Sequence, residues 1–315
     1  MNAADFMQRF RNEVGKAIVG QDEAVRLCAL ALVTGGHVLL EGVPGTGKTL
    51  LAKAVARVLS VEFRRVQFTP DLMPADIVGT SIYDLRSREF EVRRGPVFTN
   101  VLLADEINRA PAKVQAALLE AMEERGVSLD GQQLPLPDPF LVLATQNPVE
   151  YEGTYPLPEA QQDRFLFKVL LGYPADTEEL EILRRWNDGT ELRDPVQAGV
   201  EPVLGAEDLR SVRQDARKVG VDSAIGAYIV QLAQASRSAP ELALGASPRA
   251  EVSLLLAAKA QALFDGRDFV TPDDVKALVA PSLRHRLVLR AEAEVVGHTA
   301  DSVLAQIVGR VTPPR

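Results

Sequence analysis

Short apolar runs recur along the first half of the chain and alternate with stretches of helical periodicity. Each run is bounded by turns, glycines or charges, which is typical of buried strands. The runs cover residues 37–40, 101–104 and 140–144, with a further candidate at 165–171, and the helical stretches cover 48–59 and 112–124. Alternation of this kind predicts a parallel sheet with crossover helices. The first half of the chain is therefore expected to be an α/β domain.

A turn dipeptide interrupts this pattern at Asp130-Gly131, between two short segments at 127–129 and 132–136. Asp-Gly supplies the positive φ angles that a tight hairpin turn requires. The sequence therefore predicts a hairpin within residues 123–139.

The periodicity becomes helical after Pro174. The expected helices cover residues 178–186, 206–219, 223–239, 248–264 and 272–287. Two of them open with Ser247-Pro248 and Thr271-Pro272, and Ser or Thr at the N-cap followed by Pro is a sound helix start. An irregular stretch at 187–205 separates the two regions, so we expect a core at residues 1–187 and an all-helical second domain at 188–315.

Composition narrows the class of protein. The formal net charge of −8 argues against a generally basic surface for nucleic acid. One loop does carry arginines, but Glu89 and Glu91 are interleaved with them, which favours a solvated hairpin; they are Arg86, Arg88, Arg93 and Arg94. A single cysteine, Cys28, excludes an internal disulfide. Residues 1–10 do not resemble a signal peptide, and no apolar run approaches the roughly 20 residues that span a bilayer, so a cytoplasmic location is expected.

A phosphate-binding loop is predicted directly after the first strand. The segment reads Gly42-Val43-Pro44-Gly45-Thr46-Gly47-Lys48-Thr49, and Leu50 continues into a helix. The glycines allow backbone N–H groups to converge on phosphate oxygens, Lys48 supplies a point charge, and Thr49 offers a hydroxyl to Mg²⁺. Motif and flanking elements agree, so ATP and Mg²⁺ are the expected ligands.

Two acids, Asp105 and Glu106, end the second strand. In a phosphate-loop protein the first acid holds Mg²⁺ through water and the second polarises the attacking water, which indicates hydrolysis. Taken alone, such a pair is equally consistent with a strand end or a helix cap. Asn147 follows the next strand and could contact the terminal phosphate, although Asn147-Pro148 alone is more often only a turn.

Taken together, these segments resemble the AAA+ ATPases and, within them, the MoxR family. The matching segments follow the family order and cover residues 18–21, 42–49, 95–98, 105–111, 144–148, 153–161, 163–165 and 246–249. The resemblance implies a P-loop NTPase core, with a parallel sheet sandwiched by helices, followed by a helical lid. It departs from the family at Gln162, where an aliphatic residue is usual.

The resemblance also assigns roles to individual residues. Asp105 and Glu106 match the acids of the Walker B motif, Asn147 matches sensor 1 and Arg249 matches sensor 2. Arg164 matches the arginine finger, which acts on the ATP of a neighbouring subunit and makes hydrolysis depend on a ring, commonly a hexamer. Val19, Gly20 and Gln21, with Ile18 before them, are implied to flank the adenine.

Members of the family are implicated in chaperone-like maturation of other proteins, including metal insertion, often with a partner that carries a von Willebrand A domain. The loop at residues 69–94 and the hairpin near Asp130 match insertions that project from the ring, and they are either client contacts or ordinary surface connections. Two alternatives remain open: a motor subunit of a metal chelatase, and a nucleotide-gated scaffold with negligible hydrolysis. A DNA-acting motor is disfavoured by the acidic balance.

Overall fold

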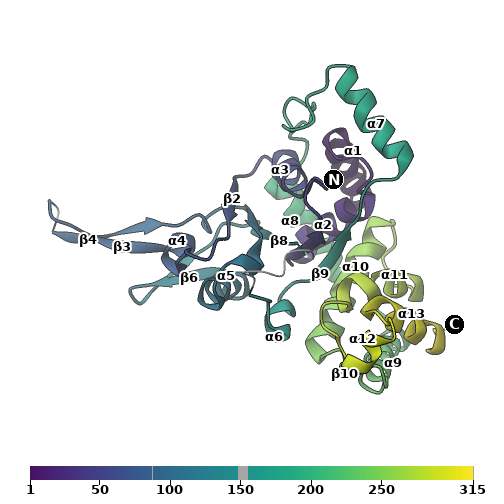
Figure 1. The fold of residues 1–315 in the computed structure, drawn as a ribbon. Helices are drawn as coiled ribbons and strands as arrows, with labels where there is room; N and C mark the ends of the chain where they lie inside the picture. Colours follow the sequence, from purple (N-terminus) through teal and green to yellow (C-terminus); the bar gives the residue numbers. More distant parts are fainter. Residues whose placement is uncertain (87, 148–154, 315) are drawn as a thin grey trace.

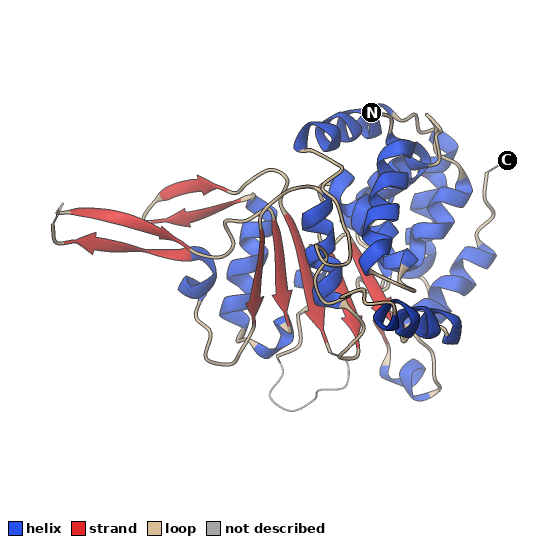
Figure 2. Cartoon of the chain, turned by 90° about the horizontal axis from the view of Figure 1, so that it is seen from above, coloured by secondary structure: helices blue, strands red, loops and turns tan. Residues whose placement is uncertain are grey.

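A five-stranded parallel sheet forms the centre of the molecule, in a computed structural model that describes residues 1–86, 88–147 and 155–314. Its strand order is β2-β5-β8-β1-β9, and Figure 2 shows the strands side by side with helices on both sides. The strands are β1 (Val38–Gly42), β2 (Phe63–Gln67), β5 (Val101–Asp105), β8 (Leu141–Gln146) and β9 (Phe167–Leu171). The predicted parallel sheet is confirmed.

The sequence pattern missed β2, the strand at one edge of the sheet. Its sequence is Phe-Arg-Arg-Val-Gln, and each of its residues is at least partly exposed. An edge strand that faces solvent lacks the apolar run by which buried strands are recognised.

Alternate residues of the inner strands point to opposite faces of the sheet, as the two-residue period of a strand requires. Val38, Leu103 and Leu143 pack into one hydrophobic cluster with α1 (Ala3–Ala17), α2 (Asp22–Thr34) and α3 (Lys48–Val58). Leu39 and Val142 pack into a second cluster with α4 (Pro74–Val78) and α5 (Ala112–Glu124). The sheet is thus covered on both faces.

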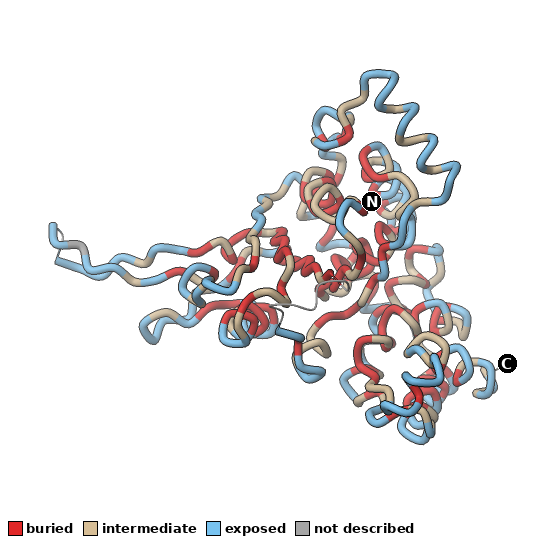
Figure 3. The backbone as a smooth tube through the Cα atoms, viewed as in Figure 1, coloured by how far each residue is buried: buried red, intermediate tan, exposed pale blue. Residues whose placement is uncertain are grey.

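Two antiparallel hairpins extend from this core. Strands β3 (Gly79–Asp84) and β4 (Glu89–Arg94) form a long hairpin that projects away from the body (Figure 1), and its outer part is exposed (Figure 3). Strands β6 (Gly126–Leu129) and β7 (Gln132–Pro135) form the hairpin predicted at Asp130-Gly131. Both turn residues have positive φ, 49° at Asp130 and 76° at Gly131, which is the backbone geometry that the dipeptide indicated.

The second half is helical, as predicted, but it has elements that the sequence pattern did not indicate. Its helices are α7 (Asp176–Asn187), α8 (Ala206–Lys218), α9 (Ser223–Arg237), α10 (Pro248–Phe264), α11 (Pro272–Leu283), α12 (Ala291–Val295) and α13 (Ala300–Arg310). The last two helices were not expected, and neither was a small sheet of β10 (Leu242–Leu244) and β11 (Val288–Leu289). The helix expected at 272–287 ends at Leu283, because the following residues turn inward and then pair with β10.

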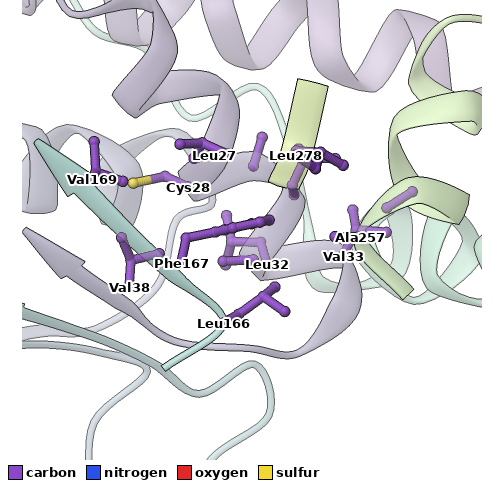
Figure 4. Close-up of a cluster of buried hydrophobic side chains, with 14 of the residues drawn as sticks. Leu27, Cys28, Leu32, Val33, Val38, Leu166, Phe167, Val169, Ala257 and Leu278 are labelled. Atoms are coloured by element: carbon purple, nitrogen blue, oxygen red, sulfur yellow. The ribbon is translucent and has the colours of Figure 1, made fainter. Parts of the chain in front are cut away.

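The helical region packs tightly on the core. A single hydrophobic cluster contains residues of α1, α2 and α3 together with residues of α8, α9, α10, α11 and α13. Figure 4 shows Leu27, Cys28 and Leu32 of α2 beside Phe167 of β9, with Leu278 of α11 nearby. At another point the ring of Phe6 in α1 stacks on that of Phe264 in α10, with centroids 6.3 Å apart. The division at residue 187 remains a prediction.

Two short elements complete the chain near the sheet: the 3-10 helix η1 (Ile107–Arg109) after β5, and α6 (Glu159–Gln162) before β9. None of the helices in the described parts of the chain has both the length and the apolar character needed to cross a membrane.

Candidate functional site

A cavity of about 720 Å³ opens at the carboxyl ends of β1, β5 and β8. These strands are neighbours in the sheet, so residues far apart in the sequence meet at this edge. The lining residues are Ala17, Ile18, Val19, Gln21, Pro44, Gly45, Thr46, Gly47, Lys48, Thr49, Leu50, Lys53, Asp105, Glu106, Asn147, Pro174, Ile182, Trp186, Leu192 and Arg193. Ligands of open parallel sheets bind at this position.

The loop between β1 and α3 has the backbone that an anion cradle requires. Gly45 and Gly47 have φ angles of 89° and 84°, and a Cβ atom added to either would meet nothing within 4 Å. Glycine is therefore needed for backbone conformation, and the space around the loop is open. Gly47 caps α3 without a side-chain hydrogen bond, which leaves the first N–H groups of this helix for an anion.

The polar side chains of the loop brace it from within. Lys48 Nζ donates a hydrogen bond to the Gly42 carbonyl at 2.6 Å, and Thr46 Oγ1 donates to the Val43 carbonyl at 3.0 Å. Gly42 is not among the described residues that line the cavity, so its part is to hold Lys48 from the end of β1. Lys48 and Thr49 both line the cavity, and the loop suits a polyphosphate by charge and by geometry.

Asp105, at the end of β5, is buried and already has two partners. Thr145 Oγ1 donates to its Oδ1 at 2.6 Å, and Arg65 contacts its Oδ2 through Nη2 at 2.7 Å and Nε at 3.0 Å. A carboxylate and the Thr49 hydroxyl on one cavity wall are the hard oxygen donors that Mg²⁺ prefers. Because the Arg65 side chain is about half exposed, it can leave Asp105 when a metal ion binds.

Glu106 has an unusual backbone conformation that fixes its carboxylate at the cavity. Its φ of 56° is left-handed, and its N–H donates to Thr145 Oγ1 at 2.8 Å. Gln67 Nε2 donates to Glu106 Oε2 at 2.6 Å, and Arg109 Nη1 lies 3.1 Å from the same oxygen. Strained residues of this kind concentrate at functional sites. Both of these contacts, from Gln67 and Arg109, fall on the same carboxylate oxygen, Oε2.

Asn147 follows β8 and is buried at the cavity wall. The structure thus brings together at this cavity five of the seven residues expected to act in catalysis or metal binding, namely Lys48, Thr49, Asp105, Glu106 and Asn147. Residues 148 and 153–154 of the expected motifs lie outside the described residues.

At its far end the cavity has an apolar wall. Val19 and Gln21 line it as expected, and Gln21 Nε2 donates to the Gly172 carbonyl at 3.1 Å. Gly20 packs instead against Glu178, whose Oε2 would lie 2.4 Å from an added Cβ. Trp186 and Arg193 also line this end, with the guanidinium 5.2 Å from the ring centroid.

Several of these residues were not identified from the sequence. Arg65 and Gln67 lie on β2, which shows no strand signal. Trp186 precedes the irregular stretch at 187–205, and Arg193 lies within it. A tryptophan at the boundary of two regions was the one local signal available.

Arg164 and Arg249 lie elsewhere. Neither is among the described residues that line the cavity. Both pair with Glu123 near the end of α5: Arg164 Nη2 lies 3.0 Å from Oε2, and Arg249 Nη1 lies 3.2 Å from Oε1. Residues of α3 and α7 line the cavity, whereas α5 packs on the opposite face of the sheet (Figure 1). The two arginines therefore form a second charged group, which is separate from the phosphate loop.

Comparison with known families matches both regions of the chain. Residues 37–167 match the model described as "ATPase family associated with various cellular activities (AAA)", and residues 214–307 match an AAA lid domain. Chaperone MoxR1 of Mycobacterium tuberculosis is 47% identical in an alignment of 318 positions that covers 98% of this chain and 82% of the relative. Protein MoxR of Methylorubrum extorquens is 36% identical, over 92% of this chain and 90% of the relative.

Two further similarities extend the comparison. The uncharacterized protein YeaC of Bacillus subtilis is 47% identical over 96% of this chain and 92% of its own length. The crystal structure of a candidate ATPase from Cytophaga hutchinsonii has a TM-score of 0.90 at 42% identity, and the match covers 99% of this chain and 96% of that one. Sequence and fold therefore lead to the same group of proteins.

Proposed function

This chain belongs to the MoxR family of AAA+ ATPases, and we propose that it hydrolyses ATP with Mg²⁺ in a ring of identical subunits, commonly a hexamer, to remodel or mature partner proteins. The observation that carries this proposal is the position of Arg164 and Arg249. They share Glu123 and lie apart from the cavity that holds the other expected catalytic residues.

The cavity residues divide the chemistry among them. Backbone N–H groups at residues 45–49 and Lys48 Nζ would bind the phosphates at the start of α3. Glu106 would orient the attacking water and accept its proton, while Asn147 would contact the terminal phosphate. Val19 and Gln21 would hold the adenine together with the apolar wall.

Thr49 and Asp105 would hold Mg²⁺, and these residues suit that ion by their oxygen donors. When bound, the ion neutralises charge on the phosphate oxygens. Arg65 has to release Asp105 Oδ2 before Asp105 can hold the ion, and its half-exposed side chain has room to do so.

The two arginines would complete the site of a neighbouring subunit. A guanidinium that stabilises charge in phosphoryl transfer is worth about 10³–10⁵ in rate, yet this chain places both of its candidates outside its own cavity. A head-to-tail contact between subunits would bring them to the neighbour's phosphates, and such contacts close into rings. Until that contact forms, Glu123 holds the two positively charged side chains together by pairing with both of them.

The remodelling part of the proposal rests on the family and on exposed apolar side chains. One of the relatives is named a chaperone. The β3–β4 hairpin exposes Leu85 and Phe90 to 83% and 71%, and exposed apolar patches mark interaction sites. A protein client would bind there, while the helical lid shifts with the nucleotide; a partner with a von Willebrand A domain and metal insertion are part of the same proposal.

The test is the steady-state ATPase rate as a function of protein concentration. For wild type we expect the rate per subunit to rise with concentration, and we expect Glu106→Gln to abolish it. Arg164→Ala should lose about 10³-fold or more, while the exposed arginine variant Arg210→Ala should keep the wild-type rate. Negligible hydrolysis at every concentration would favour the scaffold instead.

A mixing experiment tests whether Arg164 acts on the ATP of a neighbouring subunit. Lys48→Ala subunits cannot bind ATP productively but keep their arginines, and Arg164→Ala subunits keep their cavities. Mixed rings should therefore recover part of the lost rate. If the mixture stays inactive, or if Arg164→Ala alone is active, the ring mechanism is wrong.

A further inference from the structure

A buried arginine joins the helical lid to the segment that carries Arg164. Arg286 follows α11, and its side chain is only 3% exposed. Its Nε lies 2.8 Å from Asp163 Oδ1, and its Nη2 donates to the carbonyls of Asp163 at 3.1 Å and Phe165 at 2.9 Å. One side chain thus contacts the residues immediately before and after Arg164.

The same guanidinium also contacts the helix that carries Arg249. Arg286 Nη2 donates to Ser253 Oγ of α10 at 3.0 Å. At the start of α10, Ser247 Oγ lies 3.4 Å from Asp163 Oδ2. Asp163 is therefore held by α10 and by the residues after α11, and Arg164 is fixed relative to Arg249.

His285 strengthens this junction. Its Nε2 donates to the Phe165 carbonyl at 2.9 Å, and the ring is buried. Burial holds the pKa of His285 well below its ordinary value, with the charge of Arg286 acting in the same direction. Because its ring is neutral, His285 adds a hydrogen bond at this junction without adding a further positive charge.

Burying a charged arginine at this junction costs free energy, so it is expected where the position of the joined segment matters. Burial lowers the pKa of Arg286 to about 10, opposed by the charge of Asp163, so the guanidinium stays protonated at neutral pH. Among the described residues, neither Nε nor Nη1 of Arg286 makes a hydrogen bond, so the contact of Nε with Asp163 Oδ1 is an ion pair alone. A buried ion pair adds little stability compared with apolar packing, and its best-attested benefit is a defined register.

We propose that Arg286 is a positioning residue that holds Arg164 in register with Arg249, so that both guanidinium groups reach the nucleotide of the neighbouring subunit as one rigid unit. This inference rests on the ring mechanism proposed above. Arg286 also couples the lid to Arg164, because a shift of α10 and α11 moves the segment 163–165 along with them.

The first test compares Arg286→Met with Arg284→Met. Arg284 is a matched control because its Nη1 also joins the lid to the core, at the Lys168 carbonyl 3.1 Å away, while its Nε donates to Asp301 instead of to residues 163–165. Arg286→Met should lower kcat by about tenfold or more, since small misplacements of catalytic groups cost up to about 100-fold. KM for ATP should stay within about twofold of wild type, and Arg284→Met should keep the wild-type kcat.

If Arg286→Met does not fold, the milder variants Arg286→Lys and Asp163→Asn test the positioning role of Arg286. Lysine keeps the charge but cannot present a planar fork to several acceptors, so its kcat should lie between those of Arg286→Met and wild type. Wild-type kcat in both of these milder variants would overturn the proposal.

Mixing with Lys48→Ala separates this inference from the ring mechanism. Arg286→Met subunits keep their cavities, so Lys48→Ala neighbours with intact arginines should restore part of the rate. If Lys48→Ala rescues Arg164→Ala but not the Arg286 variants, the ring mechanism stands and the positioning role is wrong. If neither is rescued, the ring mechanism itself fails.

Discussion

Gln67 and Glu106 are joined by a hydrogen bond in which Gln67 Nε2 donates to Glu106 Oε2 at 2.6 Å. The two residues end neighbouring parallel strands, since Gln67 lies in register with Asp105. Gln67 is therefore the group on β2 that fixes the carboxylate proposed to orient water.

Gln67→Ala should lower kcat about tenfold and leave KM for ATP nearly unchanged. Without the amide, Glu106 samples other rotamers, and loss of a fixed geometry slows the chemical step more than it weakens binding. Steady-state kinetics at varied ATP concentration measure both constants. Gln8→Ala, on the exposed face of α1, is the control; a wild-type kcat in Gln67→Ala would remove Gln67 from the site.

Trp186, the single tryptophan of the chain, should report on nucleotide binding. It lines the apolar end of the cavity beneath Arg193, so a bound base changes the surroundings of the ring. We expect saturable fluorescence changes on titration with ADP or ATP. Trp186→Ala should raise KM severalfold with kcat retained, and fluorescence that is insensitive to nucleotide would place the base elsewhere.

Arg65 and Mg²⁺ should compete for Asp105. Arg65→Gln removes the guanidinium from Oδ2, and we therefore expect half-maximal binding of Mg·ADP at a severalfold lower Mg²⁺ concentration. Trp186 fluorescence during Mg²⁺ titration measures this without turnover, and chelation of Mg²⁺ should abolish hydrolysis. Arg64→Gln on the same strand is the control. An unchanged or higher Mg²⁺ requirement in Arg65→Gln would contradict the competition.

His37 should make the protein less stable in mild acid. Burial lowers the pKa of His37 to about 3, with the charge of Arg125 acting in the same direction. Its Nδ1 accepts a hydrogen bond from the Val142 N–H at 3.0 Å. The unfolded chain takes up the proton near the ordinary pKa of about 6.5. Stability should therefore fall as pH drops from about 6.5 towards 3, by about 1.4 kcal/mol per pH unit for this group.

Denaturant unfolding at a series of pH values tests this dependence. His37→Asn should show a shallower loss, with the remaining slope owed to His285, whose pKa shifts in the same direction. His298→Asn is the control at a partly exposed position. Identical slopes in wild type and His37→Asn would exclude the buried neutral ring as the cause.

Phe6→Ala should destabilise the core and the lid together. The ring is fully buried and stacks on Phe10 and on Phe264 of α10, each with centroids 6.3 Å away. Loss of such a side chain costs about 3–5 kcal/mol. Because α1 and α10 belong to one hydrophobic cluster, thermal unfolding should stay a single transition at lower temperature. Phe269→Ala, at an exposed ring, should have little effect, and separate transitions in Phe6→Ala would show that the two regions unfold independently.

The sequence alone determined the local chemistry. The strand from residue 38, the phosphate loop and the acids at 105–106 were predictable because each pattern is confined to a few consecutive residues whose backbone requirements are local. The same is true of the Asp130-Gly131 turn and of the caps at Ser247 and Thr271. Family order of these motifs then indicated an AAA+ core with a lid.

Only the tertiary structure decided which residues meet. Strand order places Arg65 and Gln67 beside Asp105 and Glu106, although an exposed edge strand has no apolar signature. Arg164 and Arg249 both pair with Glu123, and Arg286 pairs with Asp163. Each of these ion pairs joins residues more than thirty positions apart in the sequence. Contacts of that kind depend on how whole elements pack, which no local pattern of residues encodes.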